Sequence, residues 1–349
     1  MSQEQEFLEL GIGDTVTSIN AQEVLSWMQK GVIVQLHISH WRPYTSLNEE
    51  DLGIEKDVSV DRFIQLGRKK LLPPPIIAKL ESLALRARTN LREFSFACPW
   101  GRFVPVSTWN AWRESNEVYK TSFYALRDEL VASLPNSIET LREIYTKMAE
   151  DAYKRLQYDK EATPPEEFTE NFVQQCLRKV PDPQVVAGTF RYSELFSYMP
   201  LWDRAVEFVQ NGAAEEDETR AEIAQQMVSQ RREMIASFLS EVSSSLRNML
   251  VSACTKVKES IDKNENVLHG STKKMLTNLL ERVDALNFCN DQQVIRMITD
   301  IRASLVSQEG GDKNAEDVAR AVEAVGEACK QQLEQIQNWS GSRFAALEV

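Results

Sequence analysis

The chain has 349 residues, with 40 Lys and Arg against 52 Asp and Glu, so its formal net charge at pH 7 is -12. Its 42% hydrophobic content, with only 13 Gly and 12 Pro, excludes a collagen-like, linker-like or disordered chain and leaves few turn residues for an all-β sandwich. The length is enough for one large or two ordinary domains. We therefore expect a mainly α protein whose core needs neither disulfides nor metals.

No apolar stretch approaches the roughly 20 residues that a membrane-spanning helix needs, and the first residues lack the basic start and apolar middle of a signal peptide. We expect no transmembrane segment and a cytoplasmic location. The five cysteines are widely spaced and form no CxxC pair, which favours reduced core thiols over a disulfide framework or a zinc site. They are Cys98, Cys176, Cys254, Cys289 and Cys329.

The N-terminal third predicts a small antiparallel β element. After an acidic N-terminus, residues 1–19, which we expect to be mobile, Asn20 is a suitable cap for a short helix. Alternating apolar residues predict a strand over 32–38, and aromatic runs on both sides of a Pro-Trp-Gly turn predict a hairpin over 93–106. A helix over 74–91, beginning at a run of prolines, would pack on this sheet.

From residue 108 onward the apolar spacing is helical. We expect Pro135 to separate this first helix from a second over 137–158, which gives an antiparallel hairpin or a kinked rod. A shorter helix ends near residue 179, and the prolines that follow make this point the predicted boundary between a domain over 20–180 and a long-helix bundle over 181–340.

The C-terminal half begins with an aromatic patch around Phe190 and Tyr192 and predicts a long helix that reaches about residue 266. Further helices are expected over 275–288, 290–306 and 314–339, with Asn290 and Gln293 resembling a capping box. The last residues, Leu347, Glu348 and Val349, match the start of a protease-site tag, so 341–349 is set apart as a tail that need not belong to the natural chain.

The long helix carries an apolar heptad stripe of coiled-coil character. We expect the stripe to lie in the core of an elongated bundle or at a self-association interface, because an exposed apolar line of that length favours aggregation. This spacing is why we expect a homo-oligomer. The stripe consists of Val228, Ile235, Val242 and Met249.

Motifs of catalysis and metal binding are missing from the sequence. His37 and His40 lie three residues apart on an expected strand and would point to opposite faces, so they predict no metal site. The segment Gly270 to Lys273 lacks the pattern of a phosphate-binding loop. We expect no catalytic residue, no cofactor and no metal.

Positive charge is concentrated in residues 68–102, which contain eight basic and two acidic residues. One interpretation is a docking surface for nucleic acid or an acidic partner; the other is a solvated helix face neutralised by acids elsewhere in the fold. A pI of about 5.0 argues against dedicated nucleic-acid binding. The candidate partner-binding residues are Lys69, Lys70, Arg86, Arg88 and Arg92.

Residues 32–132 carry short motifs that resemble a bacterial and phage family catalogued as domain of unknown function 3150. The family's pattern is a strand ending near a Trp, an acidic segment, an L-G-x-K step, a helix and a G-x-x-F hairpin, followed by coiled-coil-like helices. The matching residues are Trp41, Leu47, Glu50, Asp51, Leu52, Leu66, Gly67, Lys69, Gly101, Phe103 and Pro105.

Members of that family are genomic neighbours of MoxR-type AAA ATPases and von Willebrand factor A proteins in phages, mobile elements and defence systems. The resemblance implies a non-catalytic adaptor or scaffold for such an ATPase, and it supplies no catalytic residues. Two alternatives stay open: a self-assembling structural or effector protein, including a membrane-active one, and a nucleic-acid-associated factor that uses residues 68–102.

Overall fold

The computed structural model describes residues 7–12, 15–46, 68–71, 75–155, 164–178, 180–199, 218–263, 269–306 and 314–347. As expected, the chain is mainly α with a small antiparallel sheet. It divides into two compact units. Unit 1 contains residues 1–35, 91–113 and 195–349, and unit 2 contains 36–90 and 114–194. Segments of the two units therefore alternate along the chain, whereas we expected a single boundary near residue 180.

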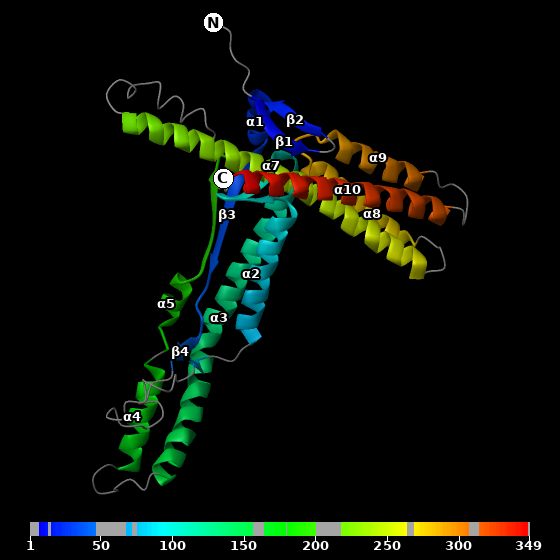
Figure 1. The fold of residues 1–349 in the computed structure, drawn as a ribbon. Coiled ribbons are helices and arrows are strands. Elements are labelled where there is room, and N and C mark those ends of the chain that lie inside the picture. Colours follow the sequence, from blue (N-terminus) through cyan, green and yellow to red (C-terminus); the bar gives the residue numbers. More distant parts are fainter. Residues whose placement is uncertain are drawn as a thin grey trace. The chain divides into compact units, whose positions relative to one another are not determined.

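Strands within residues 7–20 form a β-hairpin, although we expected residues 1–19 to be mobile. Strands β1 (Phe7–Ile12) and β2 (Thr15–Asn20) pair antiparallel, with Leu10 opposite Thr17. The hairpin lies against two helices of unit 1, α7 and α10, whose bounds are given below (Figure 1). Tertiary packing stabilises a two-stranded ribbon that would be marginal by itself. Helix α1 (Ala21–Met28) follows directly.

The predicted strand and hairpin form a four-stranded sheet in the order β6-β7-β3-β8. It comprises β3 (Gly31–Ser39), β6 (Phe96–Cys98), β7 (Gly101–Pro105) and β8 (Arg191–Ser197). Gly31 lies against an aromatic ring, because an added Cβ would come within 2.2 Å of Phe103. Gly101 has a φ of 139°, a conformation that favours glycine. Strand β8 falls in the aromatic patch, where alternation was too weak to predict it.

Unit 2 has its core between α2 (Pro75–Glu93) and α3 (Val106–Arg155), with the ends of both helices belonging to unit 1. Leu80, Ala84 and Phe123 are buried in this core. Unit 2 also contains two shorter helices, α4 (Pro165–Leu177) and α5 (Pro183–Gly188). It further contains the short strands β4 (Tyr44–Ser46) and β5 (Arg68–Lys70).

Helix α3 corrects the prediction of two helices separated at Pro135. It is one helix of 50 residues with the proline inside, about 75 Å long at 1.5 Å per residue. Leu130 and Leu134 are fully buried before the proline, and Tyr145 is buried after it. Packing of one apolar face on both sides of Pro135 outweighs the lost backbone hydrogen bond.

Four helices of unit 1 form a bundle in which each packs on the next, in the order α7-α8-α9-α10, and α10 returns to α7 (Figure 1). Lys258 of α7 pairs with Glu323 of α10, and Arg247 with Gln332, so these two helices run antiparallel. The bounds are α7 (Glu218–Lys263), α8 (Gly270–Leu286), α9 (Gln292–Val306) and α10 (Asn314–Leu347). Helix α10 thus continues past residue 339 into the expected tail.

The buried face of α7 departs from the expected heptads. Ile235 and Val242 are fully buried, but Met249 is only partly buried and Leu250 takes its place in the core. The side chain of Val228 lies outside the described residues. Buried positions recur after 11 residues, a spacing of 3.67 residues per turn that keeps a nearly straight helix in contact with its neighbours. They are Ile235, Leu239, Val242, Leu246, Leu250, Ala253, Val257 and Ile261.

Candidate functional site

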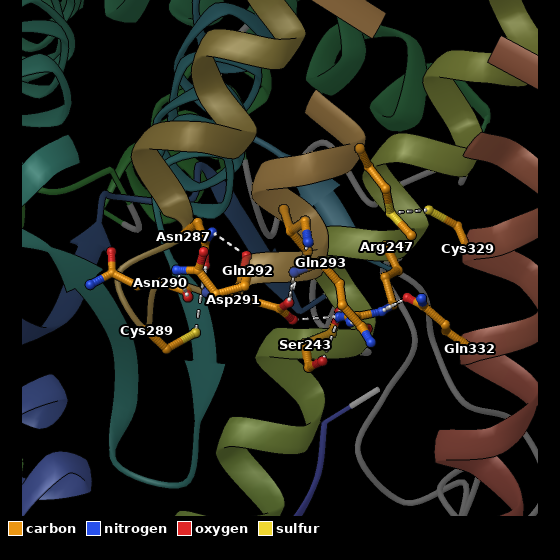
Figure 2. A network of polar contacts seen from close by, with 12 residues as sticks. Ser243, Arg247, Asn287, Cys289, Asn290, Asp291, Gln292, Gln293, Cys329 and Gln332 are labelled. Atoms are coloured by element: carbon orange, nitrogen blue, oxygen red, sulfur yellow. Dashed lines mark hydrogen bonds and ion pairs between the residues drawn. The ribbon is translucent and has the colours of Figure 1, made fainter. Parts of the chain in front are cut away.

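A buried polar network crosses the core of the four-helix bundle and centres on Arg247 (Figure 2). The Arg247 side chain is fully buried, and its Nη1 lies 2.8 Å from Oδ2 of Asp291. Nη1 also donates to the Ser243 side chain, Nη2 donates to Gln293, and Nε donates to Gln332 at 2.7 Å. One guanidinium therefore joins α7, the start of α9 and α10.

Asp291 binds Arg247 with one oxygen and caps α9 with the other. Its Oδ1 accepts hydrogen bonds from the backbone N–H groups of Gln293 and Val294. This corrects the capping box expected at Asn290, which instead has a φ of 54° in the turn before the helix. The Asn287 side chain accepts from the backbone N–H of Asp291 and so fixes the same turn.

Three cysteines lie in the same helical core. Burial raises the pKa of Cys254 and of Cys289 to about 12 and that of Cys329 to about 11. The Cys329 thiol contacts the Met297 sulfur at 3.4 Å. Thiols with such pKa values are protonated at neutral pH and are poor nucleophiles. The prediction of core cysteines fits these positions.

The Arg247 network is suited to specifying structure. Its charge is matched by Asp291 and its donors are directed at oxygens of neighbouring helices, which is the condition for a buried ion pair to be tolerated. Such a pair disfavours other registers of the bundle, because a slipped register would bury an unpaired charge. We treat it as the element that aligns α7, α9 and α10.

A second polar network lies in unit 2, between α3 and β8. The Tyr192 hydroxyl donates to Asn116 at 2.7 Å, and the Asn116 amide donates to Glu194 at 2.8 Å. Lys120 lies 3.6 Å from the same carboxylate. Burial, with the charges of Glu194 and Glu117, raises the pKa of Tyr192, so its hydroxyl stays protonated. Tyr192 is therefore unsuited to exchange protons near neutral pH.

The structure gathers aromatic side chains on the surface of unit 1 where α3 begins. Phe196 lies edge-on to Trp109, with ring centroids 5.3 Å apart, and the Arg113 guanidinium lies 5.9 Å from the Trp109 centroid. Tyr198 is 84% exposed, and Phe196 and Val106 are also exposed. Val106 precedes Trp109 by about one turn of α3, and Tyr198 follows Phe196 by two residues. We call Val106, Trp109, Arg113, Phe196 and Tyr198 the aromatic surface. Trp112 is fully buried and lies next to Phe196.

The predicted basic segment does not form one helix face. On α2, Arg86 and Arg88 are 200° apart around the helix axis, because each residue turns the helix by 100°. Arg92 lies on the same face as Arg88. Arg86 contacts Ser82, and Arg88 donates to the Ile38 carbonyl at 3.0 Å. The candidates are also divided between the units: Arg92 belongs to unit 1 and the others to unit 2. Lys69 and Lys70 lie in β5, and their side chains are outside the described residues.

Sequence reasoning missed Arg247 and Asp291, and it did not bring Trp109 and Phe196 of the aromatic surface together. The sequence contains one weak signal that Arg247 is buried. Arg247 directly follows Leu246, which lies on the apolar face of α7. The partner Asp291 is 44 residues away, and nothing in the local pattern links the two. The resemblance residues between 47 and 67 lie outside the described part of the chain.

The described residues contain no group of three or more His, Cys, Asp or Glu arranged to hold a metal ion. Within the same ranges, no helix is long and apolar enough to cross a membrane. Comparisons of the chain with protein-family models, with curated proteins and with solved structures found no match.

Proposed function

We propose that this chain is a non-catalytic, cytoplasmic adaptor or scaffold that works with a MoxR-type AAA ATPase and a von Willebrand factor A protein, in a phage, mobile-element or defence context. The identity of the partners rests on the resemblance in residues 32–132. The class of function, binding to another protein, is supported by one observation, the aromatic surface on unit 1.

The aromatic surface has the composition of a protein-binding hot spot. Trp, Tyr and Arg are the residues that contribute most to protein interfaces, because they bury large rigid areas and carry a polar group at one end. Tyr198, at 84% exposed, has most of its ring available to a partner. The buried polar networks, by contrast, use their donors and acceptors on internal contacts. The chemistry offered to a partner is therefore that of surface recognition.

The decisive experiment is co-purification of this chain with a MoxR-type AAA ATPase. We expect the wild-type chain to retain the ATPase and to change its rate of ATP hydrolysis. Phe196→Ser and Tyr198→Ser should reduce retention by about tenfold or more, as loss of a hot-spot side chain does. Leu85→Ser and Val185→Ser are matched controls, because both residues are 60% exposed and apolar but belong to unit 2. Equal retention of all four variants would contradict the role of the aromatic surface.

Self-assembly into a structural or effector protein is the second candidate function. Ile144 and Met148 lie one helical turn apart on α3 and are 47% and 53% exposed, which is the spacing that a helix presents to another helix. A homo-oligomer that dissociates when Ile144→Asp is introduced, together with no binding to the ATPase, would favour this function. Leakage of vesicles caused by the purified protein would favour its membrane-active form.

A further inference from the structure

Three arginines from separate segments of unit 1 meet at the carboxyl end of α2. Arg92 is exposed in the last turn of the helix. Arg102 of β7 donates from Nε to the Ser95 hydroxyl at 2.7 Å and from Nη2 to the Ser95 carbonyl at 2.8 Å. Arg282 of α8 donates from Nε to the Glu93 carbonyl at 2.9 Å. We call these residues the arginine site.

The helix end explains part of this arrangement. The last carbonyls of an α-helix lack partners within the helix and carry partial negative charge. Besides the two arginines, the Thr108 hydroxyl donates to the Phe94 carbonyl and the Ser95 hydroxyl to the Leu91 carbonyl. The two arginines make their own contacts through Nε and Nη2 of Arg102 and through Nε of Arg282. In the part of the chain that the structure describes, the remaining guanidinium nitrogens of Arg102 and Arg282 have no hydrogen-bond or ion-pair partner.

Within the described residues, no carboxylate forms an ion pair with Arg92, Arg102 or Arg282. Arg102 lies opposite Val34 on β3 and Ala97 on β6. The neighbours of Arg282 one turn away on α8 are Asn278, Leu279, Ala285 and Leu286. Asp284, on another face of α8, is paired with Arg302. The acids next in sequence are Glu93, beside Arg92, and Glu281, beside Arg282, and both side chains are exposed.

The electrostatic environment of Arg102 agrees with an unbalanced site. Its pKa is lowered, first by burial and then by the positive charge of Arg92. A guanidinium keeps its charge despite such a shift, because its pKa starts from a very high value. A bound anion would relieve the repulsion between Arg92 and Arg102. The site is therefore positively charged and partly preorganised by the contacts through Nε.

We propose that the arginine site binds carboxylates of an acidic protein segment. This inference rests on the proposed adaptor function and names the chemistry of one contact. Guanidinium nitrogens held by fixed contacts suit carboxylates and lose little rotamer entropy on binding. A compact group of three arginines differs from the long basic track that nucleic acid requires.

The test is fluorescence anisotropy with a labelled peptide of eight glutamates, an eight-glutamine peptide and a single-stranded oligothymidylate with the same number of charges. We expect the glutamate peptide to bind at low salt and to weaken as salt is added. Arg92→Glu and Arg282→Glu should each weaken binding by about fivefold or more, since reversal removes an attraction and adds a repulsion. Arg92→Lys should retain most of the affinity. Arg320→Glu is the control, because Arg320 is exposed on α10 of the same unit.

Several outcomes would overturn the proposal: no binding of the glutamate peptide by the wild-type chain, equal binding by the reversed variants, or tighter binding of the oligothymidylate that the same variants abolish. Circular dichroism checks that Arg282→Glu folds. Arg92→Glu gives an independent answer, since the side chain of Arg92 is exposed and makes no hydrogen bond or ion pair in the described ranges. The peptide assay is separate from co-purification with the ATPase. If the ATPase is retained but the glutamate peptide does not bind, the arginine site is wrong. If the peptide binds but the ATPase is not retained, the adaptor function is wrong.

Discussion

Arg247 and Asp291 form an ion pair of 2.8 Å in the core of the bundle, and both side chains are almost completely shielded from solvent. The pair joins the middle of α7 to the residue that caps α9. A buried charge that loses its partner is strongly destabilising, whereas an exposed pair contributes little. The pair therefore provides a sensitive test of the bundle.

Asp291→Asn should lower the free energy of unfolding by about 3–5 kcal/mol, because Arg247 would remain charged and unpaired in the core. The amide oxygen can still cap α9, so the loss reports mainly on the ion pair. Asp317→Asn is the matched control: it removes an acid from an exposed pair with Arg320 and should cost less than about 1 kcal/mol. Urea unfolding followed by circular dichroism measures both. Similar small losses would mean that the buried pair is not needed.

Ile235→Asp should cost several kcal/mol of folding free energy, because an unpaired carboxylate would replace a fully buried side chain in the centre of the α7 seam. Met227→Asp, at an exposed position on the same helix, should be nearly neutral. Thermal unfolding and light scattering test both variants. If Ile235→Asp retained the wild-type melting temperature and mass in solution, the seam would be assigned incorrectly.

Pro135→Ala should stabilise the chain by about 1–3 kcal/mol, since alanine restores an N–H donor for the Val131 carbonyl and relieves a steric clash inside α3. Pro165→Ala is the control, because proline is favourable in the first turn of α4. The comparison uses the midpoint of chemical unfolding. A lower midpoint for Pro135→Ala would show that the proline is favourable where it lies.

The buried thiols should make the free energy of unfolding decrease at alkaline pH. Their pKa values are raised to about 12 for Cys254 and Cys289 and about 11 for Cys329, from an ordinary value of 9.0. The folded chain therefore holds protons that the unfolded chain releases above pH 9, so stability is complete below pH 9 and falls as the pH rises. Between pH 9 and its own raised pKa, each thiol lowers the free energy of unfolding by up to about 1.4 kcal/mol per pH unit.

Unfolding measured between pH 8 and pH 10.5 tests this slope. Cys254→Ala should make the slope shallower, whereas Cys98→Ala, at a less buried position, should change it less. Reaction of the native protein with a thiol reagent at pH 8 should also be slow at Cys254, Cys289 and Cys329 and rapid after denaturation. Unchanged stability up to pH 10.5 in the wild-type chain would contradict the burial of these groups.

Local patterns predicted most of the secondary structure because they depend on neighbours in the chain. Alternation over 32–38 predicted β3, the Pro-Trp-Gly turn predicted the β6 and β7 hairpin, and helical spacing predicted α7 through α10. The errors have a common cause. Pro135 remains helical, residues 7–20 form a hairpin and residues 191–197 form a strand, because partners elsewhere in the fold outweigh weak or contrary local preferences.

The candidate sites were harder to predict. Clustering of basic residues in sequence suggested one surface, but α2 separates Arg86 from Arg88 by more than half a turn of the helix. Conversely, Arg92 and Arg282 are 190 residues apart and both lie at the end of α2. Heptad spacing located the buried face of α7, but the drift of an α-helix moves the seam from Met249 to Leu250.

The sequence by itself determined that the chain is mainly α, that Ile235 and Val242 share one face of a long helix and that positive charge is concentrated in residues 68–102. These properties follow from composition and from the periodicities of 3.6 and 2 residues. Only the tertiary structure decided that Arg247 has a carboxylate partner, that Trp109 and Phe196 share a surface and that Arg282 joins Arg92 and Arg102. Each of these depends on the packing of distant segments, which short-range propensities do not encode.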